Sequence, residues 1–152
     1  MTSWAAFEAD APAIAAAARR LLWVPGVGFG YLATVDARGA PRIHPINVVI
    51  VGGALLTFVV SSPKLRDLTR DGRYALHSTG SAEVNDELML AGRAVPAPPD
   101  VDRAAAVAAA GYAVADDHVL VELGVERALW AEWSSPPRWP PTYHRWAAAG
   151  PG

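Results

Sequence analysis

The residues whose types and spacing best support chemistry form a short polar stretch, Ser61-Ser62-Pro63-Lys64, in the middle of the chain. The stretch follows an apolar run over 55–60 and opens a polar segment over 64–71, so we expect a strand that passes directly into a helix. The free N–H groups and the dipole of a helix start favour an anion, and the two hydroxyls and the ammonium would add donors. Taken alone, however, the stretch is more typical of a helix cap at Ser62 with a solvated Lys64 than of a phosphate site.

Other polar groups support fewer kinds of chemistry. The four histidines have no metal-ligand spacing, which argues against a zinc site, and we predict no metal. Glu83, Asp86 and Glu87 form an acidic loop that we expect to be solvated rather than paired for acid–base work. The serines lack a Gly-x-Ser-x-Gly context, which leaves a hydrolase unsupported. The glycines of 26–30 precede a strand instead of opening a helix, so they are no dinucleotide fingerprint.

The composition limits the class of protein. With 152 residues, 52% of them hydrophobic and 18% charged, the chain can bury the core of a single domain. A formal net charge of -2 argues against a nucleic-acid partner. The absence of cysteine excludes disulfides, thiolate metal ligands and a thiol nucleophile. No signal peptide and no membrane-spanning run can be recognised, so we expect no membrane partner and a cytoplasmic location.

Apolar periodicity and turn residues predict the elements that must position the polar stretch. We expect helices over 10–23, 64–71 and 102–111, and strands over 29–36, 41–51, 54–60, 73–79, 87–95 and 118–133. Asp10 would cap the first helix, and Asp100 or Asp102 the last. Gly39 and Gly52-Gly53 predict tight turns, so the first three strands run as a meander.

Two of the predicted strands are expected to be interrupted, and the end of the chain is expected to contain no strand or helix. We expect the strand over 87–95 to be broken near Gly92, and the strand over 118–133 to be bulged at Gly124. Residues 134–152 form a Pro- and Trp-rich tail that we expect to lack regular structure. Because the first three strands are apolar on both faces, they predict a barrel or a sheet covered by a partner.

The strand over 41–51 carries the remaining candidates. Arg42 and His44 share one face of a strand with few polar residues, and a buried guanidinium needs a partner such as a phosphate. The alternative for Arg42 is an exposed position at a barrel rim. His44 precedes a proline, which holds it extended, and it could contact a ligand or be a satisfied structural histidine. His77 is expected in the core or an interface.

Four segments appear in an order that is typical of one family: 32–36, 39–45, 62–68 and 73–77. Over roughly residues 29–95, and more loosely up to Trp133, the chain resembles the pyridoxamine 5′-phosphate oxidase-like family of flavin-binding split β-barrels. The resemblance implies a mainly β fold with flanking helices, a six-stranded antiparallel Greek-key barrel within a single domain over 1–152. It further implies a homodimer that holds FMN between its subunits and passes a hydride to or from a small molecule.

The resemblance also assigns cofactor-binding positions. In the family, an arginine on the second strand and a Ser-x-Lys at the helix start hold the cofactor phosphate, the backbone of the second strand lies along the flavin ring, and C-terminal residues of the other subunit close the site. The corresponding residues here are Arg42, His44, Pro45, Ile46, Asn47, Ser61, Ser62, Lys64, Leu65 and Trp133, with Trp130 as an alternative to Trp133. No catalytic residue is assigned.

Several positions depart from the family pattern. Asn47 stands where the true oxidases have a lysine, Pro63 stands where they have an arginine, and their C-terminal Arg-x-His signature is missing. These differences argue against oxidation of pyridoxamine phosphate. They leave open an F420-dependent reductase, a protein that carries flavin or haem without turnover, and a barrel that has lost its cofactor and serves as an interaction module.

Overall fold

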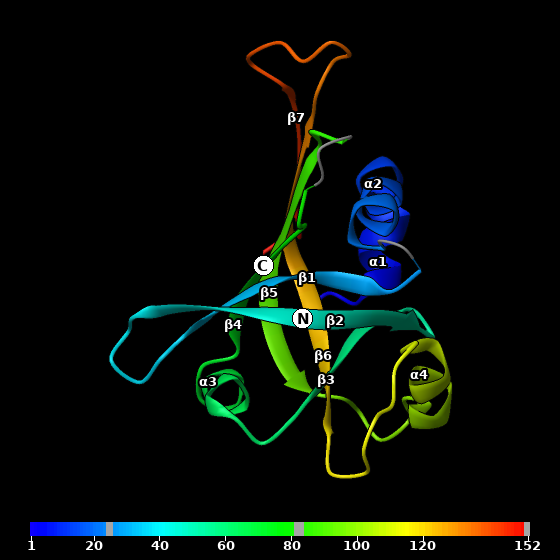
Figure 1. The fold of residues 1–152 in the computed structure, drawn as a ribbon, viewed down its shortest axis with the longest axis vertical. Helices are drawn as coiled ribbons and strands as arrows, with labels where there is room; N and C mark the ends of the chain where they lie inside the picture. The colour runs from blue at the N-terminus through cyan, green and yellow to red at the C-terminus, as the bar shows by residue number, and fades with distance from the viewer. Residues whose placement is uncertain (24–25, 81–83, 151–152) are drawn as a thin grey trace.

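The computed structural model describes residues 1–23, 26–80 and 84–150, which form a barrel with helices around it (Figure 1). The helices are α1 (Trp4–Asp10), α2 (Pro12–Leu22), α3 (Pro63–Arg70) and α4 (Arg103–Ala109). The strands are β1 (Gly28–Val35), β2 (Pro41–Val51), β3 (Ala54–Val59), β4 (Arg73–His77), β5 (Glu87–Pro96), β6 (Val119–Glu132) and β7 (Thr142–Ala147). Most predicted boundaries are therefore confirmed to within two residues.

Six strands close into an antiparallel barrel, as the family resemblance implied. Their order is β3-β2-β1-β4-β5-β6, and the pairing of β3 with β6, from Leu56↔Glu122 to Val59↔Val119, closes the circle. The inward side chains of these strands, with those of α1 and α2, form the main core, in which Leu32, Leu55 and Leu90 are fully buried. A smaller apolar cluster lies between the sheet and α4.

The N-terminal helix differs from the prediction, because residues 4–22 form two helices instead of one over 10–23. Pro12 begins α2, and a proline disfavours helical geometry at the residue before it. Ala11 accordingly has the non-helical angles φ −132° and ψ 60°. It is both the C-cap of α1 and the N-cap of α2. Asp10 is therefore not the N-cap but the last residue of α1, and its carboxylate accepts a hydrogen bond from Trp146 Nε1.

The tail also differs from the prediction, because it contains a strand. β7 pairs with the second half of β6, from Arg127↔Ala147 to Glu132↔Thr142. The prolines that suggested an irregular tail lie within 136–141, so they break only the loop before β7, and residues 142–147 contain none. We call residues 127–147 the arm: Figure 1 shows that this hairpin projects from the barrel beside α1 and α2.

Most of the predicted turn glycines and helix-capping residues have the predicted role in the structure. Gly39 has φ +85° in the predicted turn after β1, and the Asp102 carboxylate accepts a hydrogen bond from the Ala105 amide at the start of α4. The register of β5 and β6 shifts between Ala91 and Gly92, near the predicted break. The extra residue on β6 is Glu126, two positions after the predicted bulge. In the part of the chain that is described, no helix is both long and apolar enough to span a membrane.

Candidate functional site

The start of α3 lies against the middle of β2. Ser62 caps the helix, since its Oγ accepts a hydrogen bond from the Leu65 amide at 3.4 Å. The ammonium of Lys64 donates to the backbone carbonyl of Pro45 at 3.2 Å, and burial lowers the pKa of Lys64. The cap that the sequence predicted is thus confirmed, and Lys64 is half-buried instead of fully solvated.

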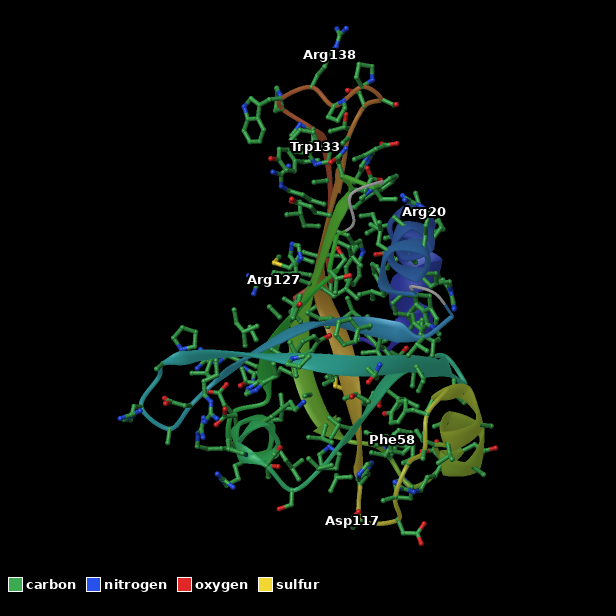
Figure 2. All side chains as sticks on the ribbon, in the orientation of Figure 1. Arg20, Phe58, Asp117, Arg127, Trp133 and Arg138 are labelled. Carbon is green, nitrogen blue, oxygen red and sulfur yellow. The ribbon has the colours of Figure 1, made fainter. Side chains whose placement is uncertain are left out.

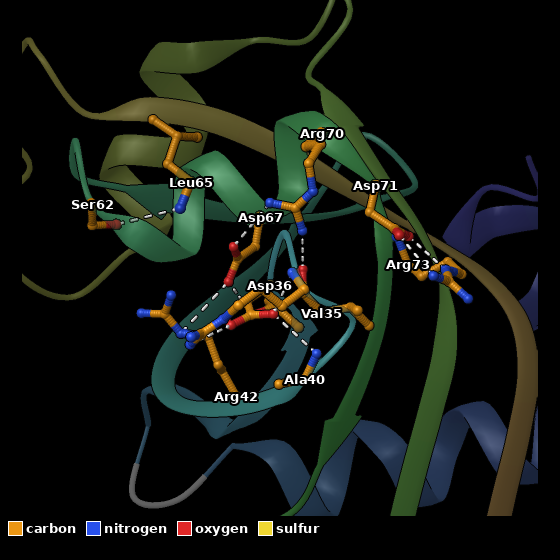
Figure 3. Close-up of polar contacts among 12 residues, drawn as sticks. Val35, Asp36, Ala40, Arg42, Ser62, Leu65, Asp67, Arg70, Asp71 and Arg73 are labelled. Atoms are coloured by element: carbon orange, nitrogen blue, oxygen red, sulfur yellow. Dashed lines mark hydrogen bonds and ion pairs between the residues drawn. The ribbon is translucent and has the colours of Figure 1, made fainter.

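We call the contact between β2 and the start of α3, around Lys64 and Arg42, the corner. A buried carboxylate, Asp67, connects the side chains in the next part of this corner (Figure 3). Asp67 of α3 accepts a hydrogen bond from the Thr34 hydroxyl at 3.0 Å. Its other oxygen lies 3.3 Å from the Arg70 guanidinium, and Arg42 Nε lies 3.7 Å from the oxygen that Thr34 contacts. Arg70 also donates to the Val35 carbonyl. Arg42 therefore has a protein carboxylate as a partner, which the sequence reasoning did not foresee.

The same network orients His44. Thr34 Oγ1 lies 3.2 Å from His44 Nε2, and its single hydrogen is donated to Asp67. His44 Nε2 must then donate to Thr34, so the neutral ring carries its proton on Nε2 and has its lone pair on Nδ1. Burial, followed by the charges of Lys64 and Arg42, lowers the pKa of His44, while Asp67 opposes this. The neutral ring is therefore the favoured form at neutral pH.

The corner has more positive than negative charge. Arg42, Arg70 and Lys64 contribute three positive charges, and Asp67 contributes one negative charge. Among the described residues no carboxylate lies within 4.0 Å of Lys64, whose recorded contact is the Pro45 carbonyl. An excess of two positive charges at a helix start matches the charge of a phosphate monoester, so these residues fit the phosphate end of a cofactor.

The other predicted binding residues of β2 and the α3 start lie close to this corner. Ile46 is buried in the core, and the Asn47 side chain donates to the Gly28 carbonyl at 3.2 Å. Ser61 is exposed. Leu65 lines a cavity of about 30 Å³ between α3 and the strands β5 and β6. Asn47 thus has a structural partner where the true oxidases carry a lysine.

Trp133 does not join the corner. Figure 2 shows it on the arm, and its backbone N–H donates to Asp86 at 2.9 Å. Asp86 also accepts from Trp130 Nε1 at 3.1 Å and lies 2.9 Å from the Arg20 guanidinium. The prediction of a solvated acidic loop is therefore wrong for Asp86. Glu87 is exposed, and Glu83 lies outside the described residues.

Sequence reasoning missed three members of the corner, namely Thr34, Asp67 and Arg70. Asp67 and Arg70 lie three and six residues after Lys64 on the same helix, and Thr34 is the direct cross-strand partner of Arg42. Pairing of the first two predicted strands could have indicated Thr34. Within 1–23, 26–80 and 84–150, no group of three or more metal-ligating side chains occurs.

Comparisons with known proteins support the fold. No protein-family model matches the sequence, and no curated protein does. Among solved structures, a haem-binding protein from Mycobacterium smegmatis superposes with a TM-score of 0.65 at 24% identity, covering 87% of this chain and 57% of its own. The chain thus spans little more than half the length of that protein.

Two further structures share the fold. An FAD-binding protein from Mesorhizobium loti has a TM-score of 0.58 at 17% identity, covering 74% of this chain and 90% of its own. An F420 reductase has a TM-score of 0.55 at 18% identity, covering 72% and 94%. At these identities the likeness establishes the architecture, which is consistent with the flavin-binding split barrels that the sequence resembles.

Proposed function

We propose that this chain is a homodimeric flavin-dependent oxidoreductase that binds FMN where β2 meets the start of α3, with F420 as the alternative cofactor. The observation that carries the proposal is the half-buried corner with an excess of positive charge around Lys64. The FAD-binding protein and the F420 reductase that share the fold support a cofactor of this type.

The chain's own groups suggest how the cofactor would be held. Lys64 and Arg42 would pair with the phosphate, and the Ser62 hydroxyl, which already accepts from Leu65, would donate its hydrogen. The β2 backbone over 44–47 would lie along the ring and orient it. A bound flavin would supply the hydride chemistry, and the protein would supply position and electrostatics for a small substrate.

An exposed apolar face supports the homodimer. Ile43 is 73% exposed and Tyr31 is 46% exposed, and Tyr31 is paired directly with the exposed Pro45. Large apolar side chains that gather on one sheet face are typical of an interface. Because Trp133 lies on the arm, only a second copy would bring it to the Lys64 corner.

Titration of the purified protein with FMN, F420 and haem, followed by absorbance and calorimetry, tests the cofactor. We expect FMN to bind, and Lys64→Gln to weaken binding by about tenfold or more, since a charge-assisted contact contributes roughly 1.5–3 kcal/mol. Arg66→Gln, which removes an exposed charge from the same helix, is the matched control. Uptake of none of the three ligands contradicts the function, and FMN binding that Lys64→Gln leaves unchanged contradicts the site.

Light scattering tests the dimer. We expect a mass of two chains for the native protein and of one chain for Ile43→Glu, because a carboxylate in the centre of an apolar interface is costly to desolvate. Val107→Glu, at another exposed apolar position on α4, should remain dimeric. A monomeric native protein contradicts this part of the proposal.

Haem is a second candidate, favoured by one observation besides the M. smegmatis neighbour. The network that protonates His44 on Nε2 leaves the Nδ1 lone pair free to ligate iron. In that case His44→Ala should abolish the shift of the haem absorbance band, whereas Lys64→Gln should affect it little.

A further inference from the structure

Glu122, on β6, is a buried carboxylate that the candidate site does not use. It is 6% exposed, and among the described residues its carboxylate accepts no hydrogen bond and forms no ion pair. The side chains of the other buried polar residues all have hydrogen bonds: Thr34 and Asp67 with each other, Thr57 to the Asn47 carbonyl, and Ser78 with the Leu88 amide. Because no donor stabilises the ionised form of Glu122, burial favours the uncharged carboxylic acid at this position.

Glu122 lies in the floor of the smaller apolar cluster, on the outer face of the barrel. Its chain neighbours Val121 and Leu123 belong to the main core, so the alternation of β6 turns Glu122 to the opposite face. Its direct partner on β3 is Leu56, which belongs to the smaller cluster. Its direct partner on β5 is Val95, so the side chains that flank Glu122 on both neighbouring strands are apolar.

The connection from β5 to α4, residues 97–102, lies over this part of the sheet. The Ala97 amide donates to the Leu120 carbonyl of β6 at 2.9 Å, and Val101 packs against the smaller cluster. The connection leads into α4, which closes the cluster over β2 and β3 through Ala106 (Figure 1). A helix of seven residues depends on packing for its stability, so a disturbance of the connection should loosen α4.

The charges that act on Glu122 come from this connection and from the start of the chain. Burial, followed by the negative charge of Asp100, raises the pKa of Glu122, while the Met1 ammonium opposes this. The charged side chains of β5 and α4 are held by other partners: Arg93 donates to the Asp71 carbonyl, and Arg103 donates to the His118 carbonyl and lies over the Phe58 ring. Ionised Glu122 therefore repels Asp100, which belongs to the segment that leads into α4.

We propose that Glu122 is a proton-operated switch for α4. The uncharged side chain lies in the apolar floor and lets the connection close over it. The ionised side chain requires water and repels Asp100, so the connection and α4 loosen. Because the pKa of Glu122 is raised in the closed form, the stabilisation of α4 is fully present below the ordinary value of 4.5 and is lost as the pH rises through the raised value. The proposal does not rest on the cofactor site, and either can fail without the other.

Hydrogen exchange of the full chain tests the switch. The protection factors of the α4 amides should fall severalfold in the native protein between about pH 4.5 and pH 8. In Glu122→Gln, whose side chain cannot ionise, they should stay high and independent of pH. Carbon-13 NMR of the glutamate side chains should show the Glu122 carboxyl titrating over the pH range in which α4 loosens.

Two further variants keep the test decisive if Glu122→Gln folds poorly. Asp100→Asn removes the repelling charge from an exposed position, so Glu122 should titrate at lower pH and α4 should lose less protection at pH 8. Asp117→Asn, the same change in the exposed turn before β6, should alter neither quantity (Figure 2). Protection of α4 that does not depend on pH overturns the proposal, as does an unaltered pH dependence in Glu122→Gln or Asp100→Asn.

Discussion

Two aspartates organise two regions of this molecule with opposite electrostatic results. Asp67, 4% exposed, connects α3 to β1 and β2 through Thr34, Arg42 and Arg70. Asp86, 13% exposed, connects α2 to the arm through Arg20, Trp130 and the Trp133 amide. Around Asp67 the charge of Lys64, which has no carboxylate partner among the described residues, adds to those of two arginines, whereas a single arginine balances the charge of Asp86. The comparison teaches that a carboxylate shielded from solvent can connect neighbouring elements in two ways. It can leave an excess of positive charge around it, as Asp67 does, or leave the local charge balanced, as Asp86 does.

The largest expected effect comes from Asp67. Asp67→Asn should lower the free energy of unfolding by roughly 3 kcal/mol, because it removes the countercharge of Arg42 and Arg70 from a buried position. Urea denaturation measures the change. Asp71→Asn, which breaks the exposed pair with Arg73, should cost far less. Equal losses in the two variants would show that the corner does not depend on Asp67.

Asp86→Asn should have a smaller global effect, about 1–2 kcal/mol, because the amide oxygen can still accept from one of the three donors. Hydrogen exchange should localise the loss to β7 and the second half of β6. An increase in exchange across β1 and β2 instead would contradict the division of the molecule into two independent regions.

The arm should also loosen in acid. Burial alone would raise the pKa of Asp86, but hydrogen bonds from the Trp133 amide, Arg20 and Trp130 outweigh it and lower that pKa. A lowered folded-state pKa means that the stabilisation is fully present above the ordinary aspartate pKa of about 4 and is lost as the pH falls through the lowered value. The protection factors of the β7 amides, which correct the exchange rates for their intrinsic dependence on pH, should fall in the native protein between pH 6 and pH 3. In Asp86→Asn this local pH dependence should be absent.

The smallest expected effect concerns Thr34, the link between Asp67 and His44. Thr34→Val should cost about 1 kcal/mol and let the His44 proton move between Nε2 and Nδ1. Nitrogen-15 NMR of the histidine rings distinguishes the two tautomers. Thr34→Ser keeps the hydroxyl and should keep the Nε2–H form, and a Val variant with an unchanged tautomer would remove Thr34 from the network.

The elements of this chain were largely predictable where local signals agree. Alternating β-branched residues between Pro41 and the Gly52-Gly53 turn predicted β2 to the residue, and Ser62 before Pro63 predicted the α3 cap. Two predicted elements were wrong because the effect of a proline was assigned to the wrong stretch of residues. Pro12 separates two helices, and the tail prolines break only the loop before β7, as the β6 pairing shows.

By itself the sequence determined the turns, the caps of α3 and α4, the alternation of the strands and the polar stretch at the α3 start, because each depends on the backbone preferences of neighbouring residues. Only the tertiary structure decided that Asp67 pairs with Arg42, and that Asp86 joins the arm to α2. Those partners lie on elements far apart in the sequence, and the packing of the helices on the closed barrel, which no local pattern specifies, brings them within reach of one another.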